Sequence, residues 1–140
     1  MNAVIETTQG RLEIELYKDD APKTVANFLR LASKGFFDGL EFFRLIQEFV
    51  VHTGCPKNDG TGNAGYLIKC EINDKEFQSG TLAMAHCGRD TGSSQFFICL
   101  SDRNVEQLVG NHTIFGQVKE GLDNLNQLKV GDKITSVKIF

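Results

Sequence analysis

Frequent turns cut the chain of 140 residues into short apolar runs, and this pattern limits the fold more than any other feature of the sequence. Runs of about four to eight residues bounded by Gly, Asn and Asp are typical of β-strands, because a helix needs a longer periodic segment. The expected strands lie at 3–7, 11–17, 41–46, 49–54, 66–70, 81–86, 95–100, 112–118 and 133–140. Many strands with only two helices predict an antiparallel β-barrel or sandwich.

Helical spacing occurs in two places. Asp20 can cap a first helix, and Pro22 fits its first turn because that turn needs no backbone donor. Apolar residues then recur at helical intervals up to Ala32, and Gly35 is expected to end the helix. A second, shorter helix fits Gly121–Lys129.

Both ends of the chain alternate between apolar and polar residues. Residues 3–7 and 11–17 flank the turn Thr8-Gln9-Gly10 and predict an antiparallel hairpin with one face in water. The tail Lys133–Phe140 has the same alternation, so we expect the two ends to pair and to close the sheet. Because the sequence has no internal repeat or linker, we expect a single domain over residues 1–140.

Composition and motifs exclude several classes of protein. The chain has no apolar segment of membrane-spanning length, no secretory signal, and a net charge of −3 with scattered basic residues. We therefore expect no membrane or nucleic-acid partner. The sequence also lacks a P-loop, a dinucleotide fingerprint and a G-x-S-x-G elbow.

The four cysteines favour a reducing compartment. Cys55, Cys70, Cys87 and Cys99 have no CxxC spacing, and reduced thiols in the cytoplasm are the better interpretation. The fragments His52-x-x-Cys55 and His86-Cys87 are a weak match to zinc, which takes about four convergent ligands. We expect no metal and no cofactor, although a metal- or redox-responsive protein stays open as an alternative.

Four separated motifs point to one family. Gly80–Leu100 reads GTLAMAHCGRDTGSSQFFICL, in which two apolar runs flank a polar loop. Residues 35–54 hold a short aromatic strand with Arg44, followed five residues later by Phe49. The helix start at Ala21–Phe28 reads APKTVANF, and residues 112–116 read HTIFG. In these motifs the chain closely resembles the cyclophilins, the cyclosporin-binding peptidyl-prolyl cis-trans isomerases.

This resemblance implies a fold and a site. The fold would be mainly β, a closed eight-stranded antiparallel β-barrel capped by two α-helices, with an active groove on its outer face. Arg44 aligns with the catalytic arginine. The substrate-binding positions of the family align with Phe49, Val50, His52, Ala85, His86, Gln95, Phe97, Gln107, Leu108 and His112.

The sequence departs from the family pattern at four of these positions. His52 replaces a glutamine that helps to position the arginine, and His86 replaces an asparagine whose backbone binds substrate. Val50 replaces a common methionine. Gln107 falls where many members carry a tryptophan that helps to bind cyclosporin, so we expect weaker cyclosporin binding. A protonated His52 would place two positive charges together, so we expect activity to fall below neutral pH.

The expected function is therefore that of a rotamase that assists protein folding. The expected partners are proline-containing peptides and unfolded or client proteins, bound by a monomer in the cytoplasm. A guanidinium can stabilise the twisted Xaa-Pro bond without a nucleophile, a metal or a cofactor. The alternative is a module of the same fold that binds proline segments and has little activity.

Overall fold

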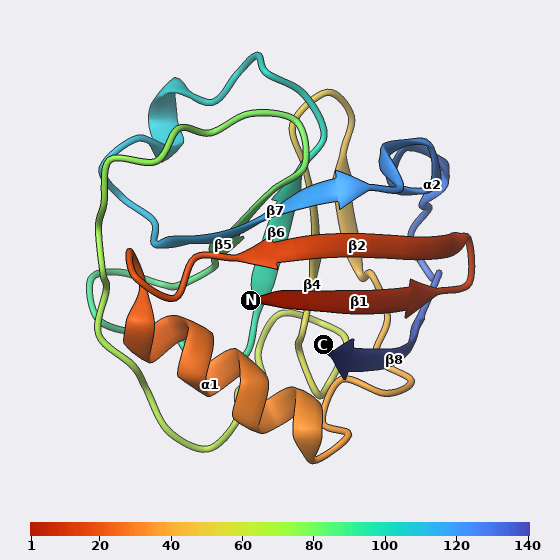
Figure 1. The fold of residues 1–140 in the computed structure, drawn as a ribbon, viewed down its shortest axis with the longest axis horizontal. Coiled ribbons are helices and arrows are strands. Elements are labelled where there is room, and N and C mark those ends of the chain that lie inside the picture. Colours follow the sequence, from red (N-terminus) through yellow and green to blue (C-terminus); the bar gives the residue numbers. More distant parts are fainter.

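A computed structural model describes all residues 1–140 and contains eight strands and two α-helices (Figure 1). The helices are α1 (Pro22–Ser33) and α2 (Leu122–Gln127), and a 3₁₀ turn, η1, covers Glu106–Leu108. Neither helix is long and apolar enough to cross a membrane. The strands are β1 (Asn2–Thr7), β2 (Gly10–Leu16), β3 (Arg44–Ile46), β4 (Val50–Thr53), β5 (Thr81–Met84), β6 (Phe96–Cys99), β7 (Ile114–Glu120) and β8 (Ile134–Ile139).

All eight strands belong to one antiparallel sheet in the order β3-β4-β6-β5-β7-β2-β1-β8. In Figure 1, β1 and β2 cross the front of the molecule, whereas β4 and β6 run steeply behind them. The sheet therefore curls around its own apolar side chains, as a strongly twisted sheet does. The predicted hairpin and the pairing of the two chain ends, β1 with β8, are both confirmed.

The closed barrel expected from the sequence is wrong, because the end strands β3 and β8 do not pair with each other. Strand β3 has only three residues, and the segment before it makes the contact with the other end of the sheet. Gly39 N donates to Ile134 O at 2.7 Å, and Phe42 N donates to Asp132 O at 2.8 Å. The sheet is thus an open half-barrel whose ends are joined by these backbone hydrogen bonds.

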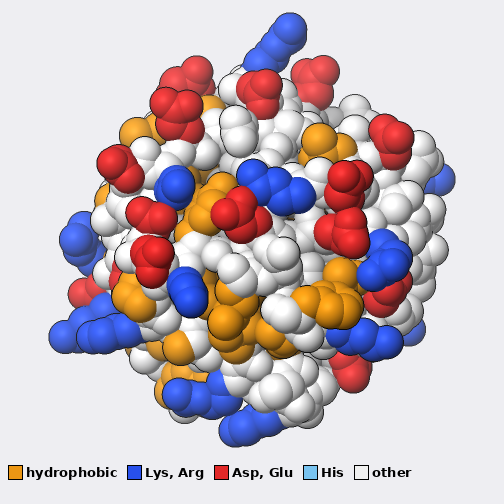
Figure 2. All heavy atoms as spheres, in the orientation of Figure 1, with side chains coloured by type: hydrophobic (Ala, Val, Ile, Leu, Met, Phe, Trp, Pro, Cys, Tyr) orange, Lys and Arg blue, Asp and Glu red, His pale blue; other side chains and the backbone are white.

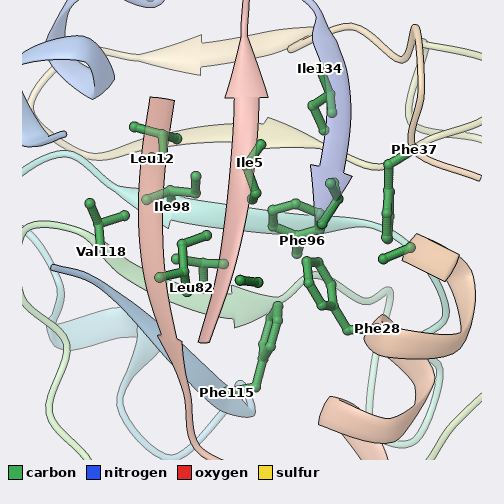
Figure 3. Close-up of a cluster of buried hydrophobic side chains, with 14 of the residues drawn as sticks. Ile5, Leu12, Phe28, Phe37, Leu82, Phe96, Ile98, Phe115, Val118 and Ile134 are labelled. Carbon is green, nitrogen blue, oxygen red and sulfur yellow. The ribbon is translucent and has the colours of Figure 1, made fainter. Parts of the chain in front are cut away.

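Alternate residues of the central strands serve two different apolar clusters. Phe96 and Ile98 of β6 point into the main core, a cluster of 24 buried residues that also holds Phe28 of α1 (Figure 3). Phe97 and Cys99 of the same strand belong to a second cluster of seven buried residues on the opposite face. Burial on both faces explains why these strands read as continuous apolar runs.

One close contact fixes the alignment of β4 with β6. Gly54 follows β4 with a φ of 88°, a backbone conformation that L-residues other than glycine rarely adopt. Its carbonyl accepts a hydrogen bond of 2.7 Å from Ser94 Oγ, just before β6. A Cβ atom at position 54 would collide with the backbone oxygen of Ser94.

Helix α1 is capped from a distant part of the chain. The expected cap, Asp20, makes no side-chain hydrogen bond to the helix start. Glu71 supplies the cap instead: its carboxylate accepts hydrogen bonds from Lys23 N at 3.2 Å and Thr24 N at 2.7 Å. This contact pins the long segment between β4 and β5 against the helix.

Two other predictions are wrong in detail. Residues 66–70 form no strand, because only Ile68 bridges to Gly92 and the segment otherwise runs as a loop. The second helix spans Leu122–Gln127, so it is shorter than the predicted Gly121–Lys129. On the face shown in Figure 2, acidic and basic side chains are interspersed with small apolar areas.

Candidate active site

The sheet register aligns three of the predicted site residues in one row. Arg44 of β3 lies directly opposite His52 of β4, and His52 lies opposite Phe97 of β6. Directly opposed residues in an antiparallel pair have side chains on the same face. The arginine and the phenylalanine therefore flank the histidine on the outer face of the sheet.

A cavity of about 180 Å³ opens over this row and contains most of the expected substrate-binding residues. Here we call it the apolar cavity. Phe97 is only 5% exposed and belongs to the second cluster beneath the cavity, so its ring has a fixed position. The cavity is lined by Arg44, Ile46, Phe49, Val50, His52, Ala85, His86, Phe97, Leu108 and His112.

Two expected residues lie elsewhere. Gln95 lines a larger, polar cavity of about 620 Å³ that adjoins the first, and its Nε2 donates to the carbonyls of Gly60 and Gly62 at 3.0 and 2.7 Å. Gln107 is exposed on η1 and lines neither cavity. Sequence reasoning missed Ile46, the last residue of β3, although its position two residues beyond Arg44 places it on the same face.

The guanidinium of Arg44 is free to bind a ligand. The side chain is exposed, and it takes part in none of the three ion pairs of the chain. The adjacent His52 packs on the ring of Phe43 with centroids 4.6 Å apart, and its buried Nε2 has no hydrogen-bond partner. The histidine therefore does not hold the guanidinium through that nitrogen.

Burial and the charge of Arg44 lower the pKa of His52 to about 4. His52 is therefore neutral at pH 7, and the expectation that it would titrate just below neutrality is wrong. A burial penalty of this kind disfavours the charged imidazole because the interior solvates charge poorly. The site thus keeps a single positive charge, that of Arg44, at this end of the row.

The other two histidines stack at the opposite wall of the apolar cavity. The rings of His86 and His112 are 4.4 Å apart, and Phe97 meets the ring of His112 edge-on at 5.1 Å. Nδ1 of His112 donates to the carbonyl of Met84 at 2.9 Å. Burial lowers the pKa of His112, and this hydrogen bond partly opposes that effect. A neutral His112 presents an apolar ring face to the cavity.

The arrangement suits one kind of chemistry. An apolar cavity bounded by aromatic rings can hold a small saturated ring, and one free cation at its edge can bind a carbonyl or an amide nitrogen. No three side chains of His, Cys, Asp or Glu converge as a metal site would require.

Comparisons with known proteins agree with this geometry. Residues 3–139 match the family model described as cyclophilin type peptidyl-prolyl cis-trans isomerase/CLD. The chain belongs to the cyclophilin-type peptidyl-prolyl cis-trans isomerase family. This confirms the family, and with it the isomerase function, expected from the sequence.

Two curated relatives of this cyclophilin match it over nearly their whole length. A peptidyl-prolyl cis-trans isomerase of Synechococcus elongatus is 50% identical, and the match covers 98% of this chain and 94% of the relative. Peptidyl-prolyl cis-trans isomerase B of Bacillus subtilis is 47% identical, with 93% and 91% covered.

Solved structures show the same fold. A cyclophilin-type isomerase of Cryptosporidium parvum has a TM-score of 0.93 and 30% identity, covering 99% of this chain and 96% of that one. A second crystal structure of that isomerase, in the presence of the dipeptide Ala-Pro, also has a TM-score of 0.93.

Proposed function

We propose that the apolar cavity holds the proline ring of a client chain and that Arg44 is the catalytic residue. The observation that carries this proposal is the register Arg44–His52–Phe97, which places a free guanidinium beside a cavity with an aromatic wall. The Ala-Pro dipeptide present with the Cryptosporidium parvum isomerase gives independent support for a proline ligand.

The chemistry follows from the resonance of the amide. An Xaa-Pro bond rotates slowly because a quarter turn breaks its conjugation, at a cost of about 18–20 kcal/mol. In the twisted state the prolyl nitrogen regains a lone pair, which a guanidinium N–H can bind. This hydrogen bond is stronger in the twisted state than in either planar state, and only such a difference lowers a barrier.

The magnitude is within reach of this site. A thousandfold acceleration requires about 4 kcal/mol of transition-state stabilisation. One charge-assisted hydrogen bond, together with a held ring, supplies energy of this order. Arginine suits the role better than lysine, because its planar fork presents several donors in a fixed geometry.

Replacement of Arg44 tests the proposal. We expect Arg44→Ala to lower kcat/KM for a proline tetrapeptide by about ten- to a thousandfold, in a protease-coupled assay, with unchanged thermal stability. Arg30→Ala is the matched control, because Arg30 is an exposed arginine on α1, outside both cavities. Equal activities of the two variants would overturn the assignment.

A second candidate, a proline-binding module with little activity, is favoured by one observation. The buried Nε2 of His52 has no partner, so this nitrogen does not hold the guanidinium of Arg44 in place. The same assay separates the two functions. A module would bind the tetrapeptide, as NMR titration would show, yet would turn it over no faster than Arg44→Ala does.

The wider setting is also part of the proposal. We expect the chain to act as a monomer on unfolded and client proteins in the cytoplasm and so to assist their folding. Support for a reducing compartment comes from the four cysteines, all of which are free thiols. Two of these thiols accept backbone hydrogen bonds. Cys55 Sγ binds Gly62 N at 3.2 Å, and Cys70 Sγ binds Asp90 N at 3.4 Å.

A further inference from the structure

His86 lies where the apolar cavity meets the larger, polar cavity. It follows β5, it is half-buried, and it lines both cavities. The preceding residue, Ala85, is fixed to the sheet, because its N–H donates to the carbonyl of Gln95 at 3.1 Å. The backbone of His86 is therefore anchored on its N-terminal side, and its imidazole is shared by the two cavities.

Two backbone groups determine which nitrogen of His86 carries the proton. Gly88 N donates to Nδ1 at 3.2 Å, so Nδ1 is the acceptor. The carbonyl of Asn111 can only accept, so Nε2, which lies 2.5 Å from it, is the donor. The ring therefore has one tautomer, with its proton on Nε2, and it joins the loop after β5 to the segment before β7.

The same imidazole supports one wall of the apolar cavity. Its ring is nearly parallel to that of His112, with centroids 4.4 Å apart and an interplanar angle of 21°. His112 also bonds to the carbonyl of Met84, and Phe97 meets its ring edge-on. Met84 and Phe97 belong to strands β5 and β6, so the stack with His86 is the one of these three contacts that comes from a loop.

The hydrogen bond to Asn111 leads to a second wall of the apolar cavity. Asn111 N donates to the carbonyl of Leu108 at 3.0 Å, and its Nδ2 donates to the carbonyl of Gln107 at 3.0 Å. Asn111 is therefore fixed to the end of η1. Leu108, the last residue of η1, is 6% exposed and lines the apolar cavity. The side chain of His86 is thus connected to both His112 and Leu108.

We propose that His86 is a positioning residue for the apolar cavity. Its hydrogen bond to Asn111 and its stack on His112 hold two walls of that cavity at the spacing that a bound proline ring requires. This inference rests on the proposed function of the apolar cavity. A saturated ring touches these walls in the planar and the twisted states alike, so the contact strengthens binding without favouring rotation. His86 therefore affects KM, whereas Arg44 affects kcat.

Two amide variants separate the roles of the two ring nitrogens. In His86→Gln the amide nitrogen takes the place of Nε2, so it can still donate to the carbonyl of Asn111, and its planar amide can lie against the ring of His112. In His86→Asn the amide oxygen takes the place of Nδ1, so it can still accept from Gly88 N, as asparagine does in turns, but it does not reach Asn111. A role within the loop would be rescued by asparagine, whereas a role across the cavity would be rescued by glutamine.

Kinetics with a proline tetrapeptide, at one fixed pH, give kcat and KM separately, and thermal unfolding shows that each variant is folded. We expect His86→Asn and His86→Ala to raise KM by about three- to tenfold with kcat unchanged, because both lose the hydrogen bond to Asn111. His86→Gln should stay within about twofold of the wild type in both constants. Arg89→Ala is the control and should match the wild type, because Arg89 is exposed on the same loop and lines neither cavity.

A long-range proton–nitrogen NMR correlation spectrum of the wild type adds a readout that needs no variant. The two stacked rings should be opposite tautomers, with the unprotonated nitrogen at Nδ1 in His86 and at Nε2 in His112. A proton on Nδ1 of His86, equal KM values for His86→Gln and His86→Asn, or a loss in kcat in place of KM would overturn the positioning role alone. If the wild type is no faster than Arg44→Ala, the proposed function itself fails, and the positioning role fails with it.

Discussion

Among single residues, His52 has the most consequential environment, because its pKa differs between the folded and unfolded chain. The folded value is about 4, against an ordinary value of 6.5. Between these pH values the unfolded chain binds a proton that the folded chain does not. Stability therefore falls as the pH drops from about 6.5 toward 4.

Substitution of His52 by glutamine makes this effect measurable. From pH 7 to about 4.5, we expect the free energy of unfolding of the wild type to fall by up to about 3 kcal/mol more than that of His52→Gln. Urea unfolding at several pH values gives both curves, and the shifted pKa of His112 affects both proteins equally. Parallel curves would show that His52 is not buried as described.

The activity of the wild type has a different pH dependence. His52 stays neutral above its folded pKa of about 4. We therefore expect that protonation of His52 causes no loss of activity between about pH 5 and 8. A histidine-like fall in this range that is absent from His52→Gln would contradict the low pKa.

At the scale of elements, α1 depends on a carboxylate that comes from another part of the chain. Glu71→Ala would leave the backbone N–H groups of Lys23 and Thr24 without their acceptor. We expect a loss of about 1–2 kcal/mol in the free energy of unfolding. Asp20→Ala is the control: its carboxylate makes only an ion pair with Lys75 at 3.8 Å, so its loss should cost less than about 1 kcal/mol. A larger loss for Asp20→Ala than for Glu71→Ala would refute this account of the cap.

The turn η1 supports a prediction about cyclosporin. Gln107 is exposed beside Leu108, which lines the apolar cavity. A tryptophan at position 107 would add apolar area and an N–H donor at the cavity rim. We expect Gln107→Trp to bind cyclosporin more tightly than the wild type in a fluorescence or calorimetric titration, and Gln127→Trp on α2 to bind it no better. Equal affinities of Gln107→Trp and the wild type would mean that this position lies outside the ligand's reach.

Local patterns predicted those elements whose stability is local. The hairpin of β1 and β2 follows from alternation and a turn, and the start of α1 follows from Pro22. The cap of α1 could not be predicted, because Glu71 lies 47 residues from Thr24 in the chain. The strand predicted at 66–70 is absent, because apolar residues next to a sheet need not form hydrogen bonds with its strands.

The residues of the candidate site could be predicted where they lie in a sequence motif that resembles a family signature. Arg44, Phe97 and His112 come from segments that resemble the family signatures, and the structure brings them around one cavity. A third cavity, of about 420 Å³, carries no such motif. Its walls, at 73–77 and 105–114, meet only through long-range packing, so no local sequence pattern predicts this cavity.

At the scale of the whole molecule, Asp132 lies at the junction of the two sheet ends: its backbone oxygen accepts the bond from Phe42 N, and its carboxylate links the β1–β2 turn to the loop before β8. Its carboxylate accepts hydrogen bonds from Thr8 Oγ1 at 2.9 Å and Lys129 N at 2.7 Å, next to the backbone bonds that join the sheet ends. We expect Asp132→Ala to lower the free energy of unfolding by about 1–3 kcal/mol, because the substitution leaves these donors without an acceptor. Asp19→Ala, at an exposed aspartate, is the control, and chemical denaturation measures both. Equal stability of the two variants would show that the carboxylate of Asp132 does not stabilise this junction.

Strands β4 and β6 are buried on both faces, and this affects how reliably they pair in the correct register. Val50 lies next to Val51, and Phe96 next to Phe97, with one member of each pair on each face. If the register of either strand shifted by one residue, the two members of its pair would exchange faces. A similar side chain would then occupy the core and the cavity. These strands alone therefore discriminate poorly against a misaligned state. The discrimination comes from the contact of Gly54 with Ser94, which has no room for a Cβ atom. Two residues outside the apolar cavity thus decide which phenylalanine lines that cavity.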